Sequence, residues 1–332
     1  MPVSRRLLLQ GLGAGAAALA APAIVRAATQ VRVGYLHTLA VDGQIWLADH
    51  LGTWKKQGLD MDFRRFTTGL ELFQALIGGS IDMLATGAVI SNFPARGQGK
   101  AFLINDIEFA TAQLWANPAA GVTDFAALKG KKISTTRGTT AHVFLDKALR
   151  AHGLVPDRDV EIVNQRMSEA VTSFISGAVP AVALWLPFNV AVKEKLPGAK
   201  MLVDASAYYP ETAIVGGWAA DAGYLDKNAE TLRNVIRAWV PANDFFIANQ
   251  AEALKILHDK YYTDVPLSDL QESFAGQKMF SSRDWAKLYA DGTVAKWLDQ
   301  VTDFYVSVGG IQSPVHAKDY FVTSLYLDVV KA

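Results

Sequence analysis

Residues 133–154 read ISTTRGTTAHVFLDKALRAHGL and place a polar run between a predicted strand and a predicted helix. The run consists of Thr135, Thr136, Arg137, Gly138, Thr139 and Thr140. A helix N-terminus offers free N–H groups and about half a positive charge. Glycine lets a ligand approach the backbone, and threonine adds a neutral hydrogen-bond donor. The junction is therefore typical of a site for a small anion or polar ligand.

The same alternation of strand and helix continues on both sides of this junction. Hydrophobic patterning predicts strands at 31–36, 61–66, 81–86, 131–136, 159–165 and 181–186, and helices that include 70–79, 88–97, 141–154 and 168–178. Residues 101–117 predict further extended structure, and the chain after residue 226 predicts mostly helix. Such an order predicts an α/β protein with parallel sheets. The restart near residue 131 predicts two α/β units in series.

Composition limits the class of protein. The chain has 332 residues, of which 51% are hydrophobic and 19% charged, which indicates a globular protein. At about 150 residues per domain, this length suggests two domains. The formal net charge is zero, which argues against nucleic acid or an acidic membrane as a partner. The chain has no cysteine, so thiol catalysis, thiolate metal sites and disulfides are excluded.

The first 27 residues predict an export signal. Arg5 and Arg6 precede an apolar run rich in alanine, glycine and leucine, and the segment ends in small residues that suit cleavage after Ala27. The Ser4-Arg5-Arg6 start is similar to a twin-arginine signal. An uncleaved membrane anchor is the alternative, but glycines and Pro22 interrupt the apolar run. We therefore expect an exported, periplasmic protein.

Ligands of open α/β sheets bind outside the carboxyl ends of the strands. The residues that follow the predicted strands are His37, Thr38, Leu39, Ala40 and Asp42; Thr67, Thr68 and Gly69; Thr86 and Gly87; the run 135–140; and Leu186, Pro187 and Phe188. Most of these junctions are rich in hydroxyl groups or glycine. They predict a clamp for a small anion or polar ligand, with Arg137 adding a bidentate grip.

Each of these residues also has a structural interpretation. Threonine is a good helix N-cap, Arg137 can be a solvated charge, and His37 and His142 can be structural histidines. Trp185, Phe188 and Trp218 can belong to the core or line a pocket. No pair of residues has metal-ligand spacing, and no nucleotide-binding or nucleophile motif appears. We expect no metal, no cofactor and no catalysis.

The order of these segments resembles that of the periplasmic solute-binding proteins of ABC importers, in the nitrate/sulfonate/taurine group with its thiamine-pyrimidine-precursor relatives. The resemblance covers most of residues 30–265. It is carried by VRVGYL at 31–36, by the segment LGTWKKQGLDMDFRRFTTGLELFQALIGGSIDMLATGAVISNFPARGQG at 51–99, by LKGKKISTTRGTTAHVFLDKALRAHGL at 128–154 and by AVTSFISGAVPAVALWLPF at 170–188.

This resemblance implies the two-lobed periplasmic binding protein fold of type II, in which each lobe is a mixed, mostly parallel sheet flanked by helices. It implies lobe 1 at 28–113 plus 214–332, lobe 2 at 114–213, and a ligand enclosed between them. It further implies a likeness to aliphatic sulfonate-binding proteins, a monomer, and partners that are an ABC permease and its ATPase. The residues expected at the ligand are Thr38, Leu39, Asp42, Thr67, Thr68, Gly69, Thr86, Arg137, Gly138, Thr139, Thr140, His142, Trp185, Phe188 and Trp218.

Two departures from the group bear on the ligand. Leu186 and Pro180 stand where the group often has acidic residues. In taurine-type members an acid near the tryptophan can meet the ligand amine, so Leu186 favours an organic anion without an amine, such as a sulfonate. An aromatic, pyrimidine or carboxylate ligand stays open. The thiamine-pyrimidine synthases share the fold and use iron, but their cysteine-rich motif is missing here.

Overall fold

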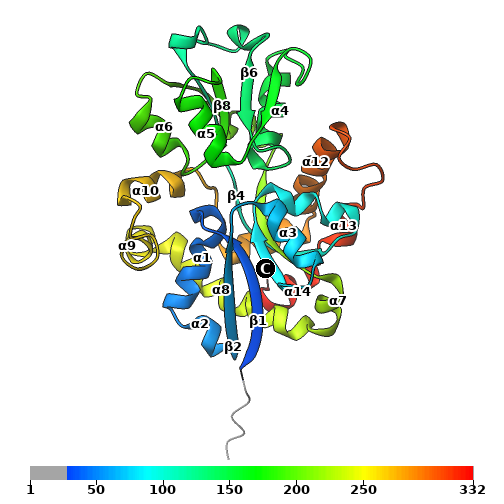
Figure 1. Cartoon of the computed structure of the whole chain (residues 1–332). Helices are drawn as coiled ribbons and strands as arrows, with labels where there is room; N and C mark the ends of the chain where they lie inside the picture. The colour runs from blue at the N-terminus through cyan, green and yellow to red at the C-terminus, as the bar shows by residue number, and fades with distance from the viewer. Residues whose placement is uncertain (1–27, 332) are drawn as a thin grey trace, which may run out of the picture.

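The computed structural model describes residues 28–331, which form two lobes, each built on one five-stranded sheet with helices around it (Figure 1). The predicted α/β fold is confirmed. The predicted export signal lies outside the described residues. Among the described residues, no helix is both long and apolar enough to span a membrane.

The two sheets have the same kind of strand order. The first runs β2-β1-β3-β10-β4 and the second β7-β6-β8-β5-β9. The strands of the first are β1 Thr29–Leu36, β2 Leu59–Phe66, β3 Met83–Thr86, β4 Lys100–Ile107 and β10 Val215–Ala220, and those of the second are β5 Ala112–Ala116, β6 Lys132–Thr135, β7 Glu161–Asn164, β8 Ala181–Trp185 and β9 Lys200–Asp204. In each sheet one strand runs antiparallel to the parallel set and makes it mixed.

Helices cover both sheets, and the carboxyl-terminal helices belong to the first lobe (Figure 1). The first lobe begins with α1 Leu39–His50, α2 Thr53–Lys56 and α3 Gly69–Ile77, and the second contains α4 Thr140–Ala151, α5 Met167–Ile175 and α6 Asn189–Lys195. The chain then adds α7 Ala222–Lys227, α8 Ala229–Ala248, α9 Gln250–Lys260, α10 Leu267–Ala275, α11 Ser282–Ala290, α12 Thr293–Ser307, α13 Ala317–Tyr320 and α14 Thr323–Val329.

The segment 88–97 differs from its predicted single helix. It forms two short 3-10 helices, η1 Ala88–Ser91 and η2 Pro94–Arg96. Pro94 lacks the N–H that a continuing helix needs, and Gly97 ends the second turn with a φ of 76°. The short turns leave the start of η1 close to the other lobe.

Two crossings of the chain connect the lobes. The first falls between β4 and β5, at residues 108–111, and the second between β9 and β10. β5 begins at Ala112, so the strand pairing of the second sheet starts two residues before the predicted boundary at 113/114. Both crossings leave from the carboxyl-end side of the parallel strands, where the ligand loops were expected.

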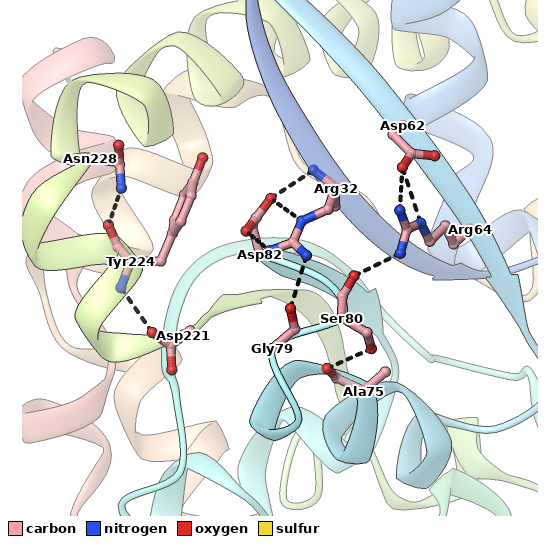
Figure 2. Close-up of polar contacts among 10 residues, drawn as sticks. All are labelled: Arg32, Asp62, Arg64, Ala75, Gly79, Ser80, Asp82, Asp221, Tyr224 and Asn228. Carbon is pink, nitrogen blue, oxygen red and sulfur yellow. Dashed lines mark hydrogen bonds and ion pairs between the residues drawn. The ribbon is translucent and has the colours of Figure 1, made fainter.

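The opposite edge of the first sheet is held by charged contacts (Figure 2). Arg32 of β1 donates from Nη2 to Asp82 Oδ1 at 2.6 Å and from Nη1 to the Gly79 carbonyl at 2.9 Å. Arg64 of β2 donates to the Ser80 carbonyl at 2.7 Å. These bonds tie the turn after α3 to both neighbouring strands and hold the start of β3, at the end of the sheet away from the ligand cavities.

Candidate functional site

Three adjacent cavities lie between the lobes. The floor cavity, about 40 Å³, is lined by Leu36, Thr38, Ala40, Val41, Gly69, Thr86, Gly87, Val89, Glu108, Thr111, Thr139, Thr140, Trp185 and Leu186. The outer cavity, about 200 Å³, is lined by Leu36, His37, Thr38, Arg65, Phe66, Thr67, Thr68, Arg166, Met167, Ser168, Trp185 and Phe188. The side cavity, about 150 Å³, is lined by His37, Thr38, Leu39, Arg65, Pro187, Tyr262, Val265, Leu270 and Ser273. Thr38 lies in the wall of all three.

The ends of four strands form the floor cavity because parallel strands finish at one edge of each sheet. β1 and β3 bring Thr38 and Thr86 from the first lobe, and β6 and β8 lead to Thr140 and Trp185 from the second. The hinge residues Glu108 and Thr111 complete it. A group in this cavity therefore touches both lobes and the connection between them.

Two glycines allow the backbone of the first lobe to lie directly against the polar side chains of the floor cavity. A Cβ at Gly69 would lie 2.4 Å from the Thr86 hydroxyl, and a Cβ at Gly87 would lie 2.2 Å from Glu108 Oε1. Only glycine allows backbone this close to these oxygens. The Thr86 side chain is fully buried, and its Oγ1 has no hydrogen-bond partner among the described residues.

Glu108 is the central polar group of the floor. Its Oε1 accepts from the Thr140 hydroxyl at 2.9 Å and its Oε2 from the Thr111 hydroxyl at 3.1 Å. Thr140 Oγ1 in turn accepts from the Ala88 N–H at 3.2 Å. Burial raises the pKa of Glu108 to about 7, against the opposing effect of the two threonine donors. At neutral pH this carboxyl is therefore divided between its charged and neutral forms.

Asp106 adds a second buried carboxyl beside Glu108. Burial, and then the charge of Glu108, raise the pKa of Asp106 well above its ordinary value. The backbone of Gly216 opposes this rise, and neither side-chain oxygen of Asp106 has a close hydrogen-bond partner within residues 28–331. The floor of the cleft is therefore acidic, which differs from the expected floor of an anion clamp.

The hydroxyl groups after β2 are occupied by a helix cap. Thr68 Oγ1 accepts from the Glu71 N–H at 3.2 Å, while the Glu71 carboxylate accepts from the Thr68 N–H at 3.3 Å. This is a capping box. The Thr67 hydroxyl also donates to Glu71. The start of α3 thus holds its own negative charge, although Thr67, Thr68 and Gly69 still line the cavities.

The loop before α4 binds mostly to its own lobe. Arg137 Nη2 donates to Asp157 at 2.5 Å and to the Ile162 carbonyl at 3.1 Å, and Arg137 lines none of the three cavities. Gly138 has a φ of 77° and donates to His142 Nδ1 at 3.0 Å. The guanidinium of Arg137 and the ring of His142 therefore make their hydrogen bonds within the second lobe. Thr139 and Thr140, in contrast, line the floor cavity.

Burial, and then the charge of Arg137, lower the pKa of His142 to about 4. The ring is neutral at physiological pH and accepts the Gly138 N–H. It packs edge-on against Phe304 of the first lobe, at 5.0 Å between ring centroids. His142 therefore joins the loop to the opposite lobe through an apolar contact.

Asp42, predicted at the ligand, is buried beneath the loop after β1. Its Oδ2 accepts from His37 Nδ1 and from Trp46 Nε1, both at 2.7 Å, and its Oδ1 accepts from the Tyr262 hydroxyl. Burial raises the pKa of Asp42, and the His37 hydrogen bond opposes that rise. The network fixes His37, while Thr38 and Leu39 reach the cavities.

The predicted aromatic residues divide between cleft and core. Trp185 and Phe188 stand edge-to-face at 5.7 Å and line the outer cavity, and Trp185 also lines the floor. Trp218 is fully buried in the first lobe, where it packs near Phe102 and donates to Asn105 at 3.0 Å. Its place on β10, the strand between β3 and β4, puts it under the sheet rather than at the cleft.

Sequence reasoning missed Glu108, Arg65 and Arg166. Glu108 lies in the crossing segment, which reads only as extended structure. Arg65 lies just before the last residue of β2, and Arg166 just before α5, so both are at element ends that face the outer cavity. Arg65 lies one residue inside the junction after 61–66, and this position could have revealed it. Arg166 follows the predicted strand at 159–165, whose carboxyl end was not among the selected junctions, and Glu108 has no comparable signal.

Several bonds join the lobes around the cavities. Glu272 of α10 accepts from Lys193 at 2.6 Å and from Asn189 at 2.9 Å, both on α6. Arg166 lies 3.5 Å from Glu71. Tyr305 of α12 donates to the Gly138 carbonyl at 3.1 Å. Together with the Thr140–Glu108 bond, these contacts define a closed arrangement.

The chain belongs to the NMT1/THI5-like family, whose model matches residues 43–253. A protein of Brucella abortus described as a binding protein is 31% identical over 296 residues, which are 89% of this chain and 91% of its own. The taurine-binding periplasmic protein of Escherichia coli is 26% identical over 324 residues, covering 94% and 97%. A 4-amino-5-hydroxymethyl-2-methylpyrimidine phosphate synthase of Saccharomyces cerevisiae is 27% identical over 272 residues, covering 75% and 77%.

Among solved structures, the alkanesulfonate-binding protein of Xanthomonas axonopodis, bound to MOPS, shares the fold. It superposes with a TM-score of 0.73 over 89% of this chain and 98% of its own, at 20% identity. The predicted two-lobed periplasmic binding protein fold and the predicted resemblance to the sulfonate and taurine group are confirmed.

The raised pKa of Glu108 predicts a specific pH dependence of stability. A carboxyl whose folded pKa is about 7 stabilises the fold fully below its unfolded pKa of 4.5, and loses that contribution as pH rises through 7. We expect Glu108→Gln to gain stability relative to the wild type between pH 4.5 and 8, by about 3 kcal/mol in all. Urea unfolding across that range measures it. The exposed Glu194→Gln is the control, and a difference that stays constant with pH contradicts the assignment.

The capping box predicts a cost for losing the Thr68 hydroxyl. Thr68→Ala removes the acceptor for the Glu71 N–H and should lower the free energy of unfolding by about 1 kcal/mol. Thr68→Ser keeps the hydroxyl and should stay within a few tenths of the wild type. Chemical denaturation of the three proteins measures both effects. Equal stability of Thr68→Ala and the wild type would remove the capping role.

Proposed function

We propose that this protein is the extracytoplasmic substrate-binding component of an ABC transporter, which captures a small organic ligand between its lobes and delivers it to a membrane permease. The observation that carries the proposal is the set of cavities whose walls come from both lobes and the hinge. A ligand held there completes its contacts only when the lobes close, so ligand binding stabilises the closed form. The closed form would then dock on the permease.

The relatives support a binding role. The taurine-binding protein is matched almost end to end, and proteins of that kind act outside the cytoplasm, in agreement with an export signal at 1–27. The enzyme reading has weaker support. The synthase relative covers less of this chain, and the chain has no cysteine to supply the motif expected of such an enzyme.

The outer cavity supports an anionic group on the ligand. Arg65 and Arg166 approach it from opposite lobes, and a guanidinium suits a sulfonate or carboxylate through paired N–H donors. Trp185 and Phe188 give the same cavity an aromatic wall, which also suits a planar ring. Sulfonates therefore lead the list of ligands, and aromatic carboxylates and pyrimidines are the second group.

A thermal-shift screen tests this function. The panel contains alkane- and arylsulfonates, taurine, nitrate, bicarbonate, aromatic carboxylates and aminopyrimidines. A ligand at 100 times its dissociation constant should stabilise the protein by about 2.7 kcal/mol, a shift of a few degrees. Shifts that saturate with one class support the proposal. No shift with any member at millimolar concentration contradicts it.

The ion pair at Glu272 predicts an effect on closure. Glu272→Gln weakens its bonds to Lys193 and Asn189, which join α10 to α6 across the cleft. Glu272 and Lys193 are both partly exposed. We therefore expect Glu272→Gln to weaken ligand binding by no more than about fivefold, through faster dissociation. Stopped-flow dissociation of the strongest panel ligand measures it. The control is Lys255→Gln, which removes the Lys255–Asp259 ion pair within α9, away from the cleft. An unchanged dissociation rate in Glu272→Gln would show that the Glu272–Lys193 pair does not hold the lobes together.

A further inference from the structure

The charges of the cleft are separated along its length. Glu108 is the one charged side chain in the described wall of the floor cavity. Arg65 and Arg166 line the outer cavity but not the floor. The two cavities adjoin at Leu36, Thr38 and Trp185, which belong to both walls. A ligand that spans both cavities therefore meets an acidic floor and a basic outer part.

The floor presents acceptors to a ligand. Each oxygen of Glu108 receives one threonine hydroxyl, and the backbone N–H of Ala88 is a further donor to this carboxyl. A carboxylate has about four lone-pair sites, so capacity for a donor of the ligand remains. The Thr86 hydroxyl, in the same wall and fully buried, has no partner within residues 28–331. Buried polar groups of this kind are normally hydrogen-bonded. The missing partner of Thr86 is thus a second sign, independent of Glu108, that a polar group completes the floor.

An anion at the floor would be repelled by the ionised form of Glu108. The titratable groups that face Glu108 are Asp106 from β4 and Tyr305 from α12, and neither supplies positive charge. A buried charge without an opposite partner is strongly destabilising. Glu108 must therefore be neutralised in the closed form by a proton or by a positive group of the ligand, or its charge must be stabilised by hydrogen-bond donors of the ligand.

We propose that Glu108 is the specificity-determining residue of the cleft and binds a nitrogen donor of the ligand, an ammonium or a ring amino group, together with the Thr86 hydroxyl. Arg65 and Arg166 bind the anionic or electron-rich opposite end of the same molecule. The proposal rests on the proposed binding function and deepens it. It replaces the expectation, drawn from Leu186, of a ligand without an amine: the acid that meets the amine comes from the hinge.

Matched probes test the proposal by isothermal titration calorimetry on the purified protein. The first pair is homotaurine and its desamino analogue propanesulfonate. The second pair is aminopyrimidine and pyrimidine. In the wild type we expect the amino member of at least one pair to bind at least about tenfold more tightly, the typical value of a charge-assisted hydrogen bond. A preference in the first pair indicates that the donor is an ammonium, and a preference in the second pair indicates that it is a ring amino group.

Substitutions at Glu108 and Thr86 test whether these two residues cause the preference for the amino ligand. Glu108→Gln should reduce the preference for the amino member to about threefold or less, and Thr86→Val should weaken the amino member alone by about threefold or more. Glu194→Gln, on the exposed face of α6, should keep the wild-type preference. If Glu108→Gln does not fold, Thr86→Val and Glu108→Asp give the same comparison.

Three results would overturn the proposal. They are equal or tighter binding of the desamino members, survival of the full preference in Glu108→Gln, and no binding of either amino member to the wild type. The proposed binding function is judged separately, by the wider ligand panel. Binding of simple anions alone would keep that function and remove the role of Glu108.

Discussion

The hydrogen bonds on Glu108 are the interaction on which the closed arrangement depends. One carboxyl receives Thr111 of the hinge and Thr140 of the second lobe, and Thr140 also receives the N–H of Ala88 in the first lobe. Burial raises the pKa of this carboxyl to about 7. An ionised carboxyl that is buried in the hinge needs a partner of opposite charge. Closure of the lobes is therefore coupled to the neutralisation of Glu108 and to the binding of a ligand group in the floor cavity.

The loops that suggested an anion clamp have largely structural duties. Glu71 occupies the donors at the start of α3, and Asp157 occupies Arg137. Positive charge is instead concentrated in the outer cavity, at Arg65 and Arg166. The cleft thus combines an acidic floor with a basic outer part, and a ligand with unlike ends fits this distribution better than a simple anion does.

Patterns in the sequence were sufficient for the fold because each α/β unit alternates apolar strands with amphipathic helices, as in 31–36 and 141–154. They also located Thr38, Thr86 and Thr140, which follow strands and line the floor. They could not locate Glu108, since a glutamate in a crossing segment has no local signature and its burial comes from residues far along the chain. For the same reason, local pattern could not reveal that Asp157 engages Arg137.

The most direct measurement is the number of protons exchanged on binding. Calorimetry at about pH 6, in two buffers of different ionisation enthalpy, gives this number for propanesulfonate and for homotaurine. If a ligand ammonium neutralises Glu108, homotaurine should bind with fewer protons taken up than propanesulfonate, by as much as one proton per ligand. The difference should vanish in Glu108→Gln. Identical proton exchange for the two ligands in the wild type would contradict the account.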